Sequence, residues 1–217
     1  MSPAFATLAI SLWVVVLCNG PFWRTLWKIQ GGLSGTTLLK FGAAFLIAIL
    51  VTNLLLTPLA FPWIGKPLLA LVTIASAVTL YFMDSYGVMI DKVMLQNVLE
   101  THPQEVGELM SWRLALYALL FGGVPVAWLA WADIAYARWW KELLWKAAIL
   151  TAMALGLAAV LFVFYKDFAS VVRNHGEVRN LLIPANYVGA ANGMLRAKAR
   201  APRTLQIVGE DARKGPR

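Results

Sequence analysis

The polar residues best suited to chemistry lie between Tyr81 and Glu108, in the sequence YFMDSYGVMIDKVMLQNVLETHPQEVGE. This segment is the longest polar stretch between two apolar runs of membrane length. Residues 83–113 hold five acidic and two basic side chains, although the whole chain has a net charge of +8. Carboxylates beside a membrane can hold a cation through charge-assisted hydrogen bonds. The segment is therefore the first place to look for a binding site.

Other signatures of catalysis or metal binding are missing from the sequence. His102 and His175 are the only histidines, and two separated histidines do not supply the three or four ligands of a zinc site. No G-x-S-x-G motif, phosphate-binding glycine loop or catalytic carboxylate pair is present. We expect Asp133, Glu142 and Asp167 to be solvated charges at the ends of membrane helices. The absence of ionisable groups from the middle of the apolar runs argues against a proton-coupled transporter or an ion channel.

Two residues at the start of the polar segment have simpler structural interpretations. Tyr86 stands where an apolar run meets the headgroup region, and tyrosine is enriched there as an interfacial anchor. Asp84 lies two residues earlier, and we expect it to be a helix-end or loop carboxylate that pairs with Lys92 or Arg113.

The composition places the chain in a membrane. It is 217 residues long, 60% hydrophobic and 14% charged, whereas soluble domains have about 25% charged residues. Ten tryptophans and six tyrosines suit the two bilayer interfaces. A basic tail beside apolar runs is better matched to anionic lipid than to nucleic acid, because no nucleic-acid-binding motif accompanies it.

Five apolar runs are long enough to be membrane helices, which need about 20 mainly apolar residues each. The sequence therefore predicts an all-α membrane protein with a five-helix transmembrane domain at residues 1–170. Residues 171–217 are predicted to form a bridging helix followed by a basic linker. The helices are expected near Ala4–Cys18, Leu38–Leu59, Pro67–Met83, Leu114–Ala132 and Ala147–Tyr165.

At this point the sequence resembles a known family. The segment YFMDSYGVMIDKVMLQNVLET, followed by a helix and then by RNHGEVRNLLIPANYV, resembles the membrane domain of the lipid A phosphoethanolamine transferases. This family includes the mobile colistin resistance enzymes. The resemblance covers essentially the whole chain and rests on Asp84, Tyr86, Gly87 and the Met94-Leu95-Gln96-Asn97 motif.

The resemblance implies a topology and a location. It implies five spans, a periplasmic helical loop between helices 3 and 4, and a periplasmic bridging segment after the fifth span. It also implies the bacterial inner membrane, with a cytoplasmic N-terminus and a periplasmic C-terminus. The count of Lys and Arg alone slightly favours a cytoplasmic tail, but long C-terminal segments cross membranes largely regardless of their charge.

The resemblance further implies where catalysis takes place in the family. A zinc-dependent periplasmic domain follows the membrane domain and carries the threonine nucleophile and the zinc ligands. On this reading the chain stops within the connector and lacks that catalytic domain. We therefore expect it to hold no cofactor and to be inactive alone.

The donor lipid of the family is phosphatidylethanolamine, which the resemblance places against an Asn, a Thr and a Glu spaced four residues apart. Asn97, Thr101 and Glu105 match this pattern. On a continuous helix they share one face, where a carboxylate can meet the ethanolamine ammonium. The alternative is structural, because residues 101–104 form a T-x-x-Q capping box and Pro103 tends to break a helix. Thr101 would then cap a new helix, with Glu105 in its first turn.

Basic residues after the fifth span are candidates for contact with lipid phosphate. Gly176 stands where family members often have a basic residue, so Arg173 and Arg179 could supply this contact instead. Further basic residues in the tail fit a solvated linker or a surface that meets anionic headgroups; they are Arg196, Lys198, Arg200 and Arg203.

Two functions remain open at this stage. The first is the membrane anchor and donor-lipid-binding domain of a phosphoethanolamine transferase that modifies lipid A phosphates. The second is a free-standing membrane protein that binds lipid or a partner. A small transporter is the least favoured alternative because the spans lack polar residues.

Overall fold

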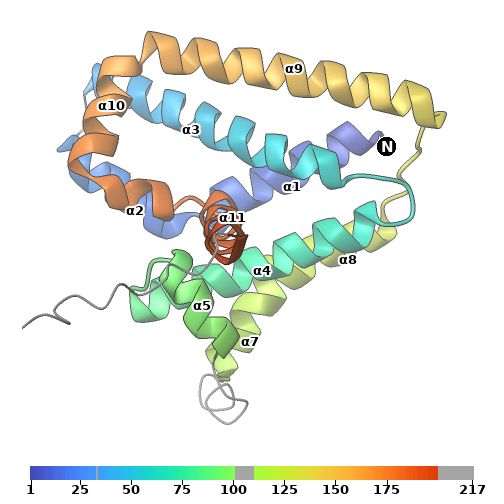
Figure 1. The fold of residues 1–217 in the computed structure, drawn as a ribbon, viewed down its shortest axis with the longest axis horizontal. Helices are drawn as coiled ribbons and strands as arrows, with labels where there is room; N and C mark the ends of the chain where they lie inside the picture. The colour runs from blue at the N-terminus through green and yellow to red at the C-terminus, as the bar shows by residue number, and fades with distance from the viewer. Residues whose placement is uncertain (33, 101–109, 200–217) are drawn as a thin grey trace, which may run out of the picture.

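The computed structural model describes residues 1–32, 34–100 and 110–199. All regular elements in these residues are helices, as the sequence predicts, and Figure 1 shows their arrangement. They are α1 (Pro3–Leu17), α2 (Gly20–Gln30), α3 (Gly35–Leu56), η1 (Thr57–Leu59), α4 (Gly65–Tyr86), α5 (Lys92–Glu100), α7 (Trp112–Tyr117), η2 (Ala118–Gly123), α8 (Val124–Trp131), α9 (Trp139–Val163), α10 (Tyr165–Asn174), η3 (Gly176–Asn180) and α11 (Ala185–Ala199).

Four of the helical segments are long and apolar enough to cross a membrane. They are Gly35–Leu59, Gly65–Tyr86, Trp112–Trp131 and Trp139–Val163. The first predicted span, near Ala4–Cys18, corresponds to α1. α1 and α2 meet at a bend of 57°, and only together do they pass the same test. The described part thus contains four or five candidate membrane helices, depending on whether the bent pair is one span.

The bend between α1 and α2 follows from the sequence Asn19-Gly20-Pro21. Pro21 has no backbone N–H and is best tolerated in the first turn of a helix, so α2 starts anew instead of continuing α1. α2 is amphipathic, with Phe22 and Leu26 buried and the charged Arg24 and Lys28 exposed. Such a helix suits the membrane interface.

The last predicted span begins eight residues earlier than expected. The sequence analysis started it at Ala147, after the charged residues, but α9 begins at Trp139. Glu142 and Lys146 lie one turn apart with 3.8 Å between Oε1 and Nζ, and their side chains are only 11% and 7% exposed. The expectation that Glu142 is a solvated charge is therefore wrong, because pairing lets both groups remain inside the helix bundle.

Tryptophans gather at the end of the bundle where α8 stops and α9 starts. Trp63, Trp131 and Trp139 are 96%, 92% and 80% exposed. Exposed rings of this kind are typical of a membrane–water interface. α2 carries Trp23 and Trp27 toward the opposite end, where α10 also lies (Figure 1).

The bundle packs closely where α4 meets η2. Gly122 lies against this contact, and a Cβ added there would be 3.3 Å from the backbone of Ile74. The chain widens into a π-helical turn over residues 118–123 before Pro125. A proline inside a helix removes one hydrogen bond and crowds the carbonyl four residues earlier, which accounts for the wider turn.

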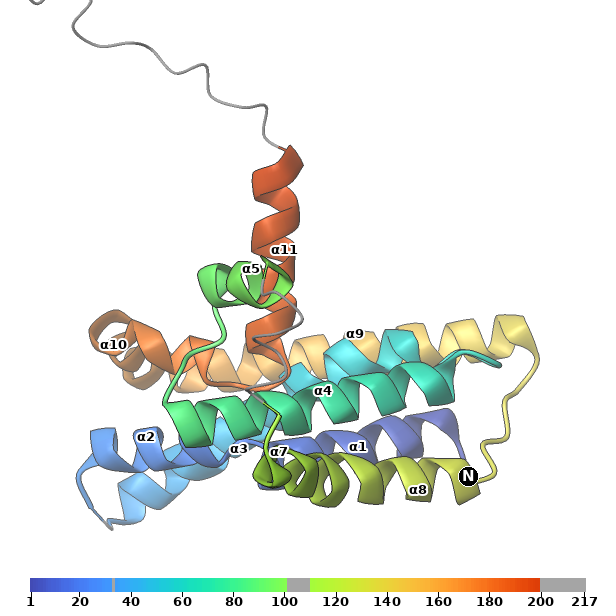
Figure 2. The ribbon, with the colours of Figure 1, turned by 90° about the horizontal axis from the view of Figure 1, so that it is seen from below.

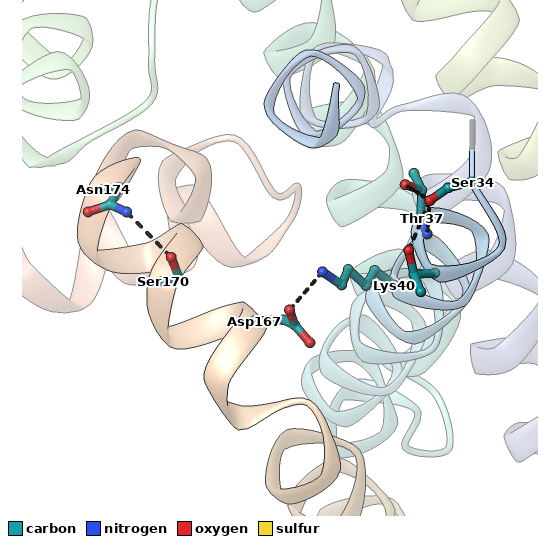
Figure 3. A network of polar contacts seen from close by, with 7 residues as sticks. Ser34, Thr37, Lys40, Asp167, Ser170 and Asn174 are labelled. Carbon is teal, nitrogen blue, oxygen red and sulfur yellow. Dashed lines mark hydrogen bonds and ion pairs between the residues drawn. The ribbon is translucent and has the colours of Figure 1, made fainter. Parts of the chain in front are cut away.

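After α9 the chain turns back along the end of the bundle. α10 is held to α3 by an ion pair between Asp167 Oδ1 and Lys40 Nζ at 2.8 Å (Figure 3). Ser34 caps α3 by accepting a hydrogen bond from the Thr37 amide at 3.1 Å. The segment that follows α10 crosses back to α1 and α4 and ends in α11, which stands across the membrane helices in Figure 2.

Candidate functional site

The polar segment places Asn97 on a short helix. α5 begins after Asp91, whose Oδ1 accepts a hydrogen bond from the Met94 amide at 2.9 Å. Asn97 is exposed on this helix. The other two predicted contacts, Thr101 and Glu105, lie outside the described residues, so the arrangement of the three side chains on one face stays a prediction.

α5 packs against the C-terminal helix α11. The two helices lie against each other and on the same side of the bundle (Figure 2). A side chain added at Gly193 of α11 would contact Lys92 at the start of α5. The helix that carries Asn97 is therefore supported by the segment that leads to the C-terminus.

Asn19 fastens the segment before α11 to the first membrane helix. Its side chain is completely buried. Nδ2 donates to the carbonyls of Val14 and Ile183 at 2.9 and 3.0 Å, and Oδ1 accepts from the Ile183 amide at 2.8 Å. The amide thus satisfies both backbone groups of Ile183 in a place without access to water. The sequence analysis did not single out Asn19, although a lone amide after an apolar run was visible.

Tyr187 holds the first turn of α11 against α4. Its hydroxyl lies 3.2 Å from Ser76 Oγ and donates to the Val72 carbonyl at 3.3 Å. Burial raises the pKa of the Tyr187 phenol to about 12, so the hydroxyl keeps its proton and can donate at neutral pH. The neighbouring Asn186 is also buried, and its Oδ1 accepts from the Tyr187 amide at 2.8 Å.

Asp84 has a different partner from those expected. Its carboxylate forms an ion pair with Arg24 of α2 and accepts a hydrogen bond from the Tyr117 hydroxyl at 2.7 Å. The prediction of Lys92 or Arg113 as partner is wrong, because sequence proximity does not reveal that α2 packs beside α4. Tyr86 is 51% exposed and stacks on Phe82, which fits an interfacial anchor.

The candidate lipid-phosphate contacts lie on the segment after α9. Arg173 and Arg179 are exposed, on α10 and η3 respectively, and their contact with lipid stays a prediction. His175 Nδ1 lies 3.3 Å from Glu177 Oε1. Arg196 is exposed on α11, whereas the side chain of Lys198 and all of Arg200 and Arg203 lie outside the description.

The described residues contain no set of zinc ligands. No group of three or more His, Cys, Asp or Glu side chains lies close enough to hold a metal ion there. Cys18 is buried and His175 faces a single carboxylate.

Comparison with known proteins identifies the family. The sequence model described as phosphoethanolamine transferase EptA/EptB matches residues 48–199. This chain belongs to that family. The match covers α4, α5 and the segment that ends in α11, and it corresponds to the N-terminal part of the family's proteins.

Individual relatives agree with this membership. The chain is 31% identical to phosphoethanolamine transferase EptA of Escherichia coli K12 over an alignment of 215 residues, and the match covers 97% of this chain and 39% of the relative. It is 30% identical to the phosphatidylethanolamine transferase Mcr-1 of Escherichia coli over 175 residues, or 79% of this chain and 31% of the relative. The chain thus spans well under half the length of these relatives.

A solved structure supports the fold. The integral membrane lipooligosaccharide phosphoethanolamine transferase A of Neisseria meningitidis superposes with a TM-score of 0.83 at 22% identity. The superposition covers 89% of this chain and 36% of the Neisseria protein. This likeness shows a shared fold, and the long apolar helices of this chain support a membrane protein.

Proposed function

We propose that this chain is the inner-membrane anchor and donor-lipid-binding domain of a phosphoethanolamine transferase that modifies lipid A phosphates. The observation that carries the proposal is the match of residues 48–199 to the EptA/EptB family. That range includes α5 with its exposed Asn97 and the α11 helix that packs against it.

The chemistry of donor binding follows from the side chains. The Asn97 amide can donate to phosphate oxygens, and Glu105 can accept hydrogen bonds from the ethanolamine ammonium. Thr101 lies between them in sequence and can either contact the phosphate or cap a helix. Packing of α11 on α5 would hold Asn97 close to the segment that carries α11.

We further propose an orientation in the membrane and the identity of the lipid partners. The N-terminus would be cytoplasmic and the C-terminus periplasmic, so that the bridging segment presents the donor lipid to a catalytic domain. Phosphatidylethanolamine and lipid A would be the lipid partners. Zinc would belong to the catalytic domain that the family resemblance implies.

Donor binding can be tested by titrating the purified chain with short-chain phosphatidylethanolamine and following tryptophan fluorescence. Loss of a hydrogen bond to a charged group costs about 1.5–3 kcal/mol, so we expect Glu105→Ala to weaken binding by roughly 10- to 100-fold. Asn97→Ala should weaken it in the same direction. Thr101→Ala should mainly lower local helix stability, which circular dichroism would detect.

Gln96→Ala is the matched control. Gln96 neighbours Asn97 on α5 and is exposed, and its side chain donates to Glu100 Oε1 at 2.8 Å. The control should bind lipid as well as the unchanged chain. Equal affinities for all the variants would refute donor binding at these residues and leave Thr101 as a helix cap.

A further inference from the structure

A polar pocket lies between α2, the end of α4 and η3. We call it the α2–η3 pocket. It has a volume of about 410 Å³, within the range of 300–1,000 Å³ that is usual for small-molecule sites. Its charged lining consists of Arg24 and Lys28 from α2, Asp84 from α4 and Glu177 from η3. Neither Asn97 nor any other residue of α5 lines this pocket.

The α2–η3 pocket is lined by two cationic and two anionic side chains. Some of them could bind a charged ligand. Arg24 and Asp84 are committed to each other by their ion pair. Lys28 is exposed and forms no ion pair with any residue in the described part of the chain. Glu177 is 41% exposed and pairs with His175 at 3.3 Å. Lys28 and the accessible Glu177 carboxylate thus share a cavity.

This arrangement complements a zwitterion. A phosphate can accept hydrogen bonds from Lys28 and from the hydroxyl of Thr25, which also lines the pocket. A primary ammonium can donate to Glu177. A purely anionic headgroup would meet the Asp84 and Glu177 carboxylates, and a quaternary ammonium has no N–H to donate.

An apolar surface adjoins the basic side of the pocket. Trp23, Trp27 and Phe41 line a neighbouring groove that shares Arg24 and Lys28 with the pocket. The rings of Trp27 and Phe41 lie 5.5 Å apart. A lipid whose headgroup occupies the pocket could place its glycerol and upper acyl carbons on these rings, because aromatic side chains prefer the membrane interface.

We propose that the α2–η3 pocket binds the headgroup of phosphatidylethanolamine, with Lys28 on the phosphate and Glu177 on the ammonium. No residue of α5, which carries Asn97, lines this pocket. The assignment rests on the proposed function because both concern the same donor lipid. A second position for the lipid on the membrane domain would hold a donor molecule in addition to the one at the proposed donor site.

The test measures lipid retention by native mass spectrometry of the purified chain. Phosphatidylethanolamine, phosphatidylcholine and phosphatidylglycerol with identical acyl chains are offered separately. We expect preference for phosphatidylethanolamine. Lys28→Gln should lower its retention about tenfold, whereas Lys28→Arg should preserve it. Glu177→Gln should lower retention of phosphatidylethanolamine but not phosphatidylcholine, so the ratio between the two lipids falls.

Two controls separate specific from general effects. Lys166→Gln removes an exposed cation on α10 that does not line the pocket, and it should leave all three lipids unaffected. Each variant should unfold within a few degrees of the unchanged chain. Free phosphoethanolamine should compete only at far higher concentration than the lipid; equal competition would overturn the assignment of a lipid.

The outcome distinguishes this inference from the proposed function. If Asn97→Ala and Glu105→Ala weaken phosphatidylethanolamine binding while Lys28→Gln and Glu177→Gln do not, the proposed function stands and the second site is refuted. If Glu177→Gln changes lipid preference while Asn97→Ala and Glu105→Ala have no effect, the pocket is the donor site and the assignment of Asn97 and Glu105 fails. An unchanged lipid ratio in Glu177→Gln refutes the pocket in every case.

Discussion

Asn19 shows how one buried amide can join distant parts of the chain. It sits at the break between α1 and α2 and bonds to Ile183, which lies 164 positions later. A buried donor or acceptor that loses its partner costs about 1–3 kcal/mol because water cannot replace it. The amide therefore contributes to the attachment of the segment before α11 as well as to the local turn.

We expect Asn19→Ala to lower the free energy of unfolding by about 1–3 kcal/mol, since both backbone groups of Ile183 would be left unsatisfied. Chemical denaturation in detergent, followed by circular dichroism, measures this change. Asn174→Ala is the control, because Asn174 is exposed and its amide makes a long hydrogen bond to Ser170 Oγ, at 3.4 Å (Figure 3). Equal stability of the two variants would contradict a buried anchoring role for Asn19.

At the scale of helices, the close contact between α4 and η2 depends on a glycine, which has no side chain. Gly122 lets the two backbones approach, with Ile74 and Ala77 opposite it. Small residues at such contacts are the main route to close packing in membranes, where the lipid is as apolar as the side chains.

We expect Gly122→Leu to destabilise the protein by about 1–3 kcal/mol, because the added atoms must displace the backbone of α4. Gly42→Leu is the matched control, since a Cβ at Gly42 meets nothing within 4 Å. The melting temperatures of the two variants in the same detergent give the comparison. A similar loss of stability in both would show that the effect comes from the glycine itself and not from the helix contact.

The bounds of the helices could be predicted where the length of an apolar run sets them. They were harder to predict where tertiary packing sets them. The runs around α3 and α4 were found within a few residues, because charged and Gly-Pro positions mark their ends. The start of α9 was missed, since Glu142 and Lys146 neutralise each other inside the bundle. The separate helix α2 was also missed, because its amphipathic pattern is short and its tertiary partner, α4, is distant in sequence.

The candidate site was predictable only in part, because several of its contacts join segments that are distant in sequence. A local motif drew attention to Asn97, and the structure places it exposed on a helix. The partner of Asp84 and the anchor at Asn19 each depend on contacts between segments 60 or more positions apart. No spacing rule in a single sequence reports such contacts.

At the scale of the whole molecule, the C-terminal helix links the membrane bundle to α5. Tyr187 and Asn19 hold its base, while its length packs against α5. α5 is a nine-residue helix, and isolated helices of this length are marginal in water. Its order should therefore depend on α11.

We expect that ending the chain after Pro184 will increase amide hydrogen exchange in α5 by at least tenfold, because the packing surface of α11 is removed. Ending it after Ala199 keeps α11 and should leave exchange in α5 unchanged. Exchange in α3 serves as an internal reference in both variants. If the amides of α5 stay equally protected from exchange in the chain that ends after Pro184, contacts other than those with α11 stabilise α5.

The unequal lengths of the helices have a consequence for the bilayer. α9 has 25 residues and α1 only 15, which correspond to about 37 Å and about 22 Å. A hydrocarbon layer of about 30 Å matches neither, so α9 is expected to tilt and the bilayer to thin beside α1. Local thinning of the bilayer beside α1 would bring the lipid headgroups closer to α2. A lipid would then move a shorter distance to leave its leaflet.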